Sequence, residues 1–258
     1  MDRDQISGLA HVDHPIAAPL DGDSVRRLLQ RSIPRGDERV LDLGCGGGEW
    51  LLRALAMHPR LRAEGVDISE NALTRARASA RTLGLEERLT LHHGDAVDFV
   101  AAHAFDLVLS VGATHVFGGL PATLAAARRH LAPGGRVLIG AGFWEREPSA
   151  EAVEMLGDLT DLATTVDRVV ADGWTPTYGH ISTRRELDDY EWNWTGSLAA
   201  WALDHPTDPD SAQALSAATT HRAGWLHSYR HAFGFVTLVL RATMTDGSVA
   251  LAEKGWRA

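Results

Sequence analysis

A short apolar segment runs directly into a cluster of glycines in VLDLGCGGGEW, residues 40–50, and a helical pattern begins near Trp50. Glycine allows the backbone to turn sharply and allows a ligand to approach it without a Cβ in the way. The helix that follows presents free N–H groups and a partial positive charge at its N-terminus. The pattern predicts a β-strand, a ligand-binding turn and a helix, which form the first unit of an α/β sheet.

Strand-like and helix-like segments alternate from this turn to about residue 145. The apolar segments 39–43, 62–66, 89–92, 105–110 and 136–141 are candidate strands, and 23–30, 70–83 and 120–131 are candidate helices. Such alternation is typical of βαβ units in a doubly wound α/β fold with a parallel sheet. A chain of 258 residues, 45% hydrophobic, has room for one such domain with a smaller appendage.

Beyond residue 147 the alternation stops, and the chain becomes helical and rich in tryptophan before a last apolar strand at 234–240. Apolar side chains at helical spacing form two stripes, Leu187, Tyr190, Trp194, Leu198 and Trp201, then Leu215, Ala218, Trp225, Tyr229 and Phe233. The loop 205–210 separates them. We therefore expect residues 183–232 to form a helical cap inserted before the last strand.

The first candidate strand is followed by the glycine turn, and the second and third are followed by acidic residues. Asp67 comes about twenty residues after the glycine turn, where a carboxylate can accept hydrogen bonds from both ribose hydroxyls. Asp95 follows the third strand and can accept from the amino group of adenine. Each acid could instead cap a helix. Because the carboxyl ends of parallel strands meet at one edge, their coincidence favours a nucleoside-bearing cofactor.

Five segments in order, LDLGCGGGEW, VDIS, HHGDA, FDLVLSVGATHVFGG and LAPGGRVLIG, resemble the motifs of class I S-adenosylmethionine (SAM) dependent methyltransferases. The resemblance covers residues 38–141. It implies a Rossmann-like, mostly parallel sheet of seven strands with a reversed last strand, and SAM as the cofactor. The domain would span 1–258, with a helical N-terminal lead at 1–37 and a SAM-binding core at 38–146. GATHVFGG followed by GFWEREP resembles a subgroup that acts on small molecules.

The resemblance also assigns roles to individual residues. Asp42, Gly44 and Gly46 would hold the methionine end of SAM, and Asp67 with Ile68 would meet its ribose and adenine. Asp95 and the backbone of Ala96 would contact the adenine edge, while Ser110, Val111 and Gly112 would line the sulfonium region.

His115 is the candidate catalytic residue, because it lies five residues past Ser110 on the loop expected to face the methyl group. A side chain with a near-neutral pKa can accept a proton from an acceptor or hold it by a hydrogen bond. The alternative is that its imidazole only ties the loop 112–119 together. We expect no metal site, because His227 and His231 lie one helical turn apart without a third ligand nearby.

Charge and composition restrict the classes of molecule that this chain can bind. A net charge of -9 argues against a nucleic-acid substrate, whose phosphates need clustered cations. The N-terminal MDRDQISGLAHVDH lacks the features of a secretory signal, and no segment approaches the ~20 apolar residues that cross a bilayer. We therefore expect no membrane partner. The single cysteine, Cys45, fits a reducing compartment, so we expect a cytoplasmic protein that acts on a small molecule.

Two other functions are compatible with a glycine turn of this kind. A nicotinamide or flavin oxidoreductase would need a third glycine where this chain has Glu49, an acid that would face the pyrophosphate unfavourably. A non-catalytic SAM-binding protein would carry the same motifs without turnover, because a fold does not guarantee an activity. The sequence leaves the identity of the acceptor and the oligomeric state open.

Overall fold

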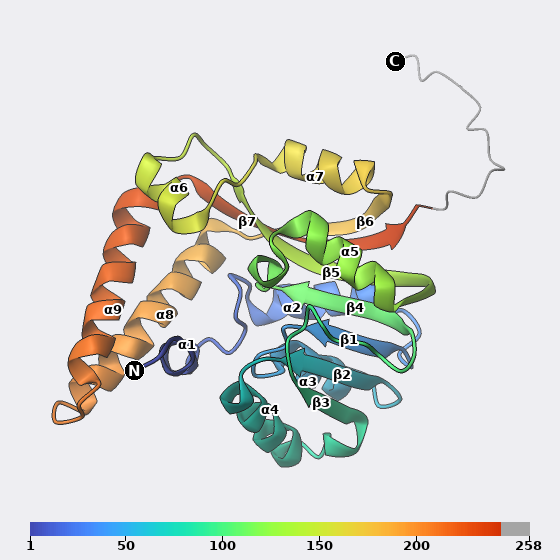
Figure 1. The fold of residues 1–258 in the computed structure, drawn as a ribbon, viewed down its shortest axis with the longest axis horizontal. Coiled ribbons are helices and arrows are strands. Elements are labelled where there is room, and N and C mark those ends of the chain that lie inside the picture. The colour runs from blue at the N-terminus through green and yellow to red at the C-terminus, as the bar shows by residue number, and fades with distance from the viewer. Residues whose placement is uncertain (244–258) are drawn as a thin grey trace.

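The computed structural model describes residues 1–243, and its centre is a mixed sheet of seven strands in the order β3-β2-β1-β4-β5-β7-β6 (Figure 1). The strands are β1 (Arg39–Leu43), β2 (Arg62–Asp67), β3 (Leu89–His93), β4 (Phe105–Val111), β5 (Leu131–Trp144), β6 (Trp174–Ile181) and β7 (Phe233–Ala242). The first five are parallel, and β7 runs antiparallel to both of its neighbours. The predicted fold, with its reversed last strand, is confirmed.

Helices cover both faces of the sheet. One face packs against α2 (Gly22–Ser32), α3 (Glu49–Met57) and α4 (Glu70–Thr82), and the other against α5 (Leu120–His130) and α7 (Leu162–Ala171). Successive side chains along a strand point to opposite faces and so belong to two separate hydrophobic clusters. Val40 belongs to the cluster on the first face and Leu41 to the cluster on the second. Both are fully buried, as expected for a central strand with helices on each side.

The strand β6 is absent from the sequence-based prediction. It contains Pro176 and Gly179, which weaken a strand pattern, and its side chains are buried only in alternation. It lies at the edge of the sheet and pairs with β7 alone, with a register shift between Pro176 and Tyr178. An edge strand tolerates proline because one row of its backbone groups needs no partner in the sheet.

A pair of long helices is inserted between β6 and β7. They are α8 (Arg184–Asp204) and α9 (Ser211–Gly224), and a π-helical turn, Trp225–Tyr229, follows them. Leu198 and Ala202 of α8 pack with Ala214 and Ala218 of α9. The helices thus occupy the segment predicted as a cap, 183–232. The first short helix, α1 (Arg3–Ala10), lies against α8, between the helix pair and the sheet (Figure 1).

The remaining helix, α6 (Ala150–Leu156), packs against the π-helical turn and the end of β5. The predicted lead, 1–37, therefore contains two helices, α1 and α2, of which only α2 was anticipated as a helix of its own. The predicted domain, 1–258, extends past the residues that the structure describes. Within that described part, no helix is both long enough and apolar enough to cross a membrane.

Candidate cofactor and acceptor site

The glycine turn after β1 adopts backbone conformations that side chains disfavour. Gly44, Gly46 and Gly48 have φ of +83°, +49° and +73°, all in the left-handed region. A Cβ on Gly44 would lie 2.7 Å from the Cβ of Ala113, so this position has no room for a side chain. The turn therefore brings the backbone after β1 close to the loop after β4.

Asp67 ends β2 and is held by two backbone amides. Its Oδ2 accepts from Gly46 N at 2.7 Å, and its Oδ1 accepts from Ser69 N at 2.8 Å. The carboxylate is half-buried, and both oxygens keep lone pairs for a further donor. This arrangement fixes a pair of acceptor oxygens at the cavity wall.

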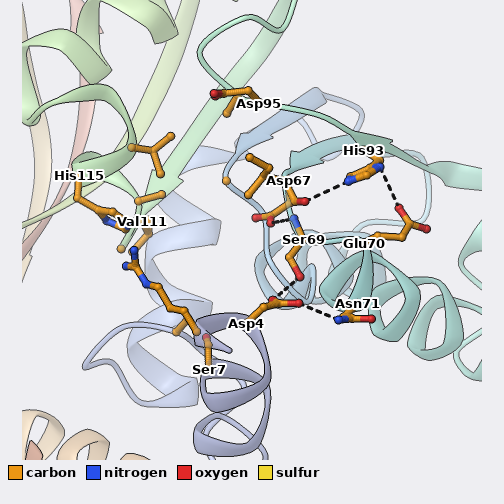
Figure 2. Close-up of a pocket in the computed structure, with 18 residues that line it drawn as sticks. Asp4, Ser7, Asp67, Ser69, Glu70, Asn71, His93, Asp95, Val111 and His115 are labelled. Carbon is orange, nitrogen blue, oxygen red and sulfur yellow. Dashed lines mark hydrogen bonds and ion pairs between the residues drawn. The ribbon is translucent and has the colours of Figure 1, made fainter. Parts of the chain in front are cut away.

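The first helix, α1, closes this side of the pocket. Asp4 accepts a hydrogen bond from Ser69 Oγ at 2.5 Å on one oxygen and from Asn71 Nδ2 at 2.9 Å on the other, as Figure 2 shows. A chain of hydrogen bonds thus runs from α1 through Ser69 to Asp67 and the glycine turn. No site residue was predicted on α1, because these contacts join residues 65 and 67 positions apart in the sequence.

The end of β3 carries two side chains of the pocket wall. Asp95 is exposed, and its Oδ1 accepts from the backbone N–H of Val97 at 2.8 Å, so it caps a turn while its other oxygen is available. His93 lies with its Nε2 3.1 Å from the carbonyl oxygen of Ile68 and thereby orders the loop after β2. His93 was not among the predicted site residues, although its position at a strand end, two residues before Asp95, indicated the same edge of the sheet.

The loop after β4 forms the opposite wall. Ser110 is buried, and its Oγ donates to the carbonyl of Leu43 at 3.1 Å, which joins β4 to β1 beneath the pocket. Gly112 has φ +79°, and a Cβ there would lie 2.5 Å from the carbonyl oxygen of Ala17. His115 follows on a short 3-10 turn, Thr114–Phe117, and its exposed side chain lines the pocket.

These elements enclose one cavity of about 720 Å³ at the carboxyl edge of the sheet. Of the predicted site residues, eight line it: Gly44, Asp67, Ile68, Asp95, Ala96, Val111, Gly112 and His115. Asp42, Gly46 and Ser110 lie outside the lining and support it from below or beside the turn. Residues that the sequence analysis did not predict complete the wall, chiefly Arg3, Asp4 and Ser7 of α1 and Ser69, Asn71 and His93.

One apolar side chain of the cavity wall is largely exposed. Ile68 is 71% exposed, a high value for a large apolar side chain that stands between two ordered turns. An adenine ring packed on its side chain would cover this surface.

Asp42 lies beneath the cavity and is almost fully buried. Burial in a medium of low polarity, with a second contribution from the charge of Asp67, raises the pKa of Asp42 to about 7. Within residues 1–243 no hydrogen-bond donor contacts its carboxylate. A buried carboxylate of this kind favours a cationic partner such as an ammonium group.

The helix pair α8–α9 holds a second group of polar side chains. Glu191 is buried and accepts from the Tyr229 hydroxyl at 2.8 Å, and its other oxygen lies 2.7 Å from His221 Nε2. Asp188 forms a two-point ion pair with Arg230. These acids therefore join the elements of the insertion to one another, and none of them lines the cavity beside Asp67.

Several known proteins are similar to this chain in sequence and fold. A family described as a methyltransferase domain matches residues 40–135. Nocamycin O-methyltransferase from Saccharothrix syringae is 36% identical over 84% of this chain and 90% of its own length. The uncharacterised protein YjhP of Escherichia coli is 26% identical over 94% of this chain and all of its own. A SAM-dependent methyltransferase from Geobacter sulfurreducens, solved with S-adenosylhomocysteine, has a TM-score of 0.84 at 25% identity and covers 92% of this chain and 98% of its own.

Proposed function

This chain belongs to the class I SAM-dependent methyltransferases, and we propose that it transfers the methyl group of SAM to a small organic acceptor bound beside His115. The observation that carries the proposal is that His115 and Asp67, from opposite walls, line the same cavity of about 720 Å³. Nocamycin O-methyltransferase, similar over nearly its whole length, supports an acceptor of low molecular weight. The net charge of -9 disfavours a polyanionic acceptor such as a nucleic acid.

The site residues are proposed in three groups that follow the length of SAM. Asp95, Ala96 and Ile68 would contact adenine, and Asp67 would accept from the ribose hydroxyls. Asp42, Gly44 and Gly46 would hold the methionine end. Ser110, Val111 and Gly112 would line the sulfonium region at the carboxyl end of β4. The residues fit the cofactor because Asp67 and Asp95 each keep acceptor capacity toward the cavity and Ile68 offers an exposed apolar surface.

When bound, SAM supplies a methyl group that its positive sulfur has already activated. The protein then has to align the acceptor opposite the carbon–sulfur bond and exclude water, which contributes roughly 7–11 kcal/mol in favourable cases. The loop 112–119 carries the groups at the acceptor end. His115 would accept the proton that a hydroxyl or amine acceptor loses as its new bond to carbon forms, while the electrons of the breaking bond remain on sulfur. This step needs no metal ion.

The helix pair in 183–232 is proposed as the cap over the acceptor, within a single domain spanning 1–258. Leu198 and Ala202 of α8 form a cluster with Ile6 and Leu9 of α1, and α1 contributes Arg3, Asp4 and Ser7 to the cavity wall. The helix pair thus packs directly on α1, the helix that forms one wall of the cavity. The single buried cysteine, Cys45, fits a reducing compartment, and the cytoplasm is the proposed location.

Incubation of the protein with SAM carrying a labelled methyl group and an extract of the source organism tests the proposal. The extract is separated by size into metabolites, proteins and nucleic acids before the label is counted. We expect the label in the metabolite fraction, at a level that falls when His115 is replaced by alanine. Label confined to protein or RNA would overturn the small-molecule assignment, and label in no fraction would contradict transfer itself.

A further inference from the structure

The carboxylate of SAM has no evident partner among the residues that the family motifs assign. SAM brings one carboxylate into the cavity, and four of the lining side chains, Asp4, Asp67, Glu70 and Asp95, are themselves acids. Placing another negative charge among them without a cation is unfavourable, because partly buried charges interact through a medium less polar than water. A counter-charge for this carboxylate is therefore required.

The glycine turn does not provide it. The N–H groups of Gly44 and Cys45 both donate to the carbonyl of Val66, at 2.9 and 3.1 Å. Gly46 N donates to Asp67, and Gly48 N donates to Cys45 at 2.8 Å. Four of the five amides of residues 44–48 are thus already satisfied by the protein, and the fifth, that of Gly47, has no partner among the described residues. They differ in this respect from a turn whose free amides cradle an anion.

The helix that follows the turn is also unsuited to an anion. Glu49 stands in the first turn of α3, where its own negative charge occupies the favourable end of the helix dipole. Its carboxylate pairs with Arg53 at 2.6 Å, so that arginine is committed as well. The counter-charge must come from another element of the cavity wall.

Arg3 is the one side chain with a permanent positive charge among the residues that line the cavity. The ion pairs of residues 1–243 that contain arginine all involve other arginines, namely Arg26, Arg35, Arg53, Arg77, Arg184, Arg185 and Arg230. Within residues 1–243 its neighbour Asp4 forms no ion pair with it, and the two oxygens of Asp4 accept from Ser69 and Asn71 instead. Those two hydrogen bonds also hold α1, and with it Arg3, against the start of α4, where Ser69 and Asn71 lie.

From these observations we infer that Arg3 binds the methionine carboxylate of SAM, an inference that rests on the cavity being the SAM site proposed above. A guanidinium presents paired N–H donors that match the two oxygens of a carboxylate. Asp42, buried beneath the same turn, is the partner suited to the ammonium group at the same end of SAM. Arg3 thereby makes α1 part of the cofactor site, in addition to its packing on α8.

The test compares ligands that differ in this one group. Calorimetry measures the affinity of S-adenosylhomocysteine and of its decarboxylated form, S-adenosyl-3-thiopropylamine, for the wild type, Arg3→Gln and Arg3→Lys. Arg60→Gln is the matched control, because Arg60 is exposed and lies just before β2, at the opposite edge of the sheet. We expect Arg3→Gln to weaken S-adenosylhomocysteine about tenfold or more, as the loss of a charge-assisted hydrogen bond would.

The decarboxylated ligand should bind wild type and Arg3→Gln equally, and Arg3→Lys should restore part of the affinity for S-adenosylhomocysteine. Unchanged S-adenosylhomocysteine affinity in Arg3→Gln would overturn the inference, and an accompanying loss of methyl transfer would assign Arg3 to an acidic acceptor instead. Equal losses for both ligands would also overturn it, because they would show a general disturbance of α1. Failure of the wild type to bind either ligand would contradict the proposed SAM site rather than the role of Arg3.

Discussion

Replacing Asp42 by asparagine should remove a specific pH dependence of stability. The pKa of Asp42 rises from 3.8 to about 7 on folding, chiefly because of burial and secondarily because of the charge of Asp67. At about 1.4 kcal/mol for each pKa unit, the difference corresponds to about 4 kcal/mol. Between pH 4 and pH 7 the folded protein retains a proton that the unfolded chain has released. The free energy of unfolding therefore falls as the pH rises through this interval and becomes independent of Asp42 above it.

Urea unfolding at pH 4, 6 and 8, with wild type and Asp42→Asn side by side, measures this effect. An uncharged amide has no such decline, so the stability of the wild type relative to Asp42→Asn should drop by up to about 4 kcal/mol between pH 4 and pH 8. The comparison of slopes cancels any constant cost of burying the amide. Stability curves that remain parallel over the whole range would refute the raised pKa and the buried, unpaired carboxylate from which it follows.

Two further outcomes are expected. His115→Ala should slow methyl transfer by about 10²-fold or more, as the loss of a general base does, while the affinity for S-adenosylhomocysteine stays within a few-fold of wild type. Equal losses of rate and affinity, or an unchanged rate, would show that His115 has only a structural role in its loop. Gly112→Ala should destabilise the protein by about 1–3 kcal/mol more than Gly118→Ala, because both glycines have positive φ but only at Gly112 would the new Cβ meet a carbonyl, that of Ala17, at 2.5 Å. Thermal unfolding of the two variants checks this second outcome, which equal losses would contradict.

The sequence predicted the parts of the fold that local patterns determine. Strands β1 and β4 are central and almost wholly buried, which gives them clear apolar segments, and each of the strands β1 to β5 is followed by a turn or a helix that its sequence indicates. By contrast, β6 lies at the edge and contains Pro176, so its pattern lacked the usual signal. The strand at 234–240 was predicted from its apolar segment, but its reversed direction was expected only from the resemblance to a family.

The residues of the candidate site also fall into a group that local sequence patterns predict and a group that they do not. Gly44, Asp67 and Asp95 follow directly after strands, so their convergence at one edge was predictable from the order of elements. Arg3 and Asp4 were not predictable, since they reach the cavity only because α1 packs across the sheet edge and bonds to Ser69. Contacts between distant segments depend on tertiary packing, and a single sequence carries no local pattern for them.

The most direct test of the account is a calorimetric titration of S-adenosylhomocysteine into wild type, Asp67→Ala and the control Asp167→Ala, whose exposed side chain lies on α7 away from the cavity. The structure holds the Asp67 carboxylate at the cavity wall with two backbone amides and spare acceptor capacity. We expect Asp67→Ala, confirmed as folded by circular dichroism, to bind ten- to a hundredfold more weakly, a loss of about 1.4–3 kcal/mol, and Asp167→Ala to match wild type. Undiminished affinity in a folded Asp67→Ala protein would contradict the assignment of this cavity as the SAM site.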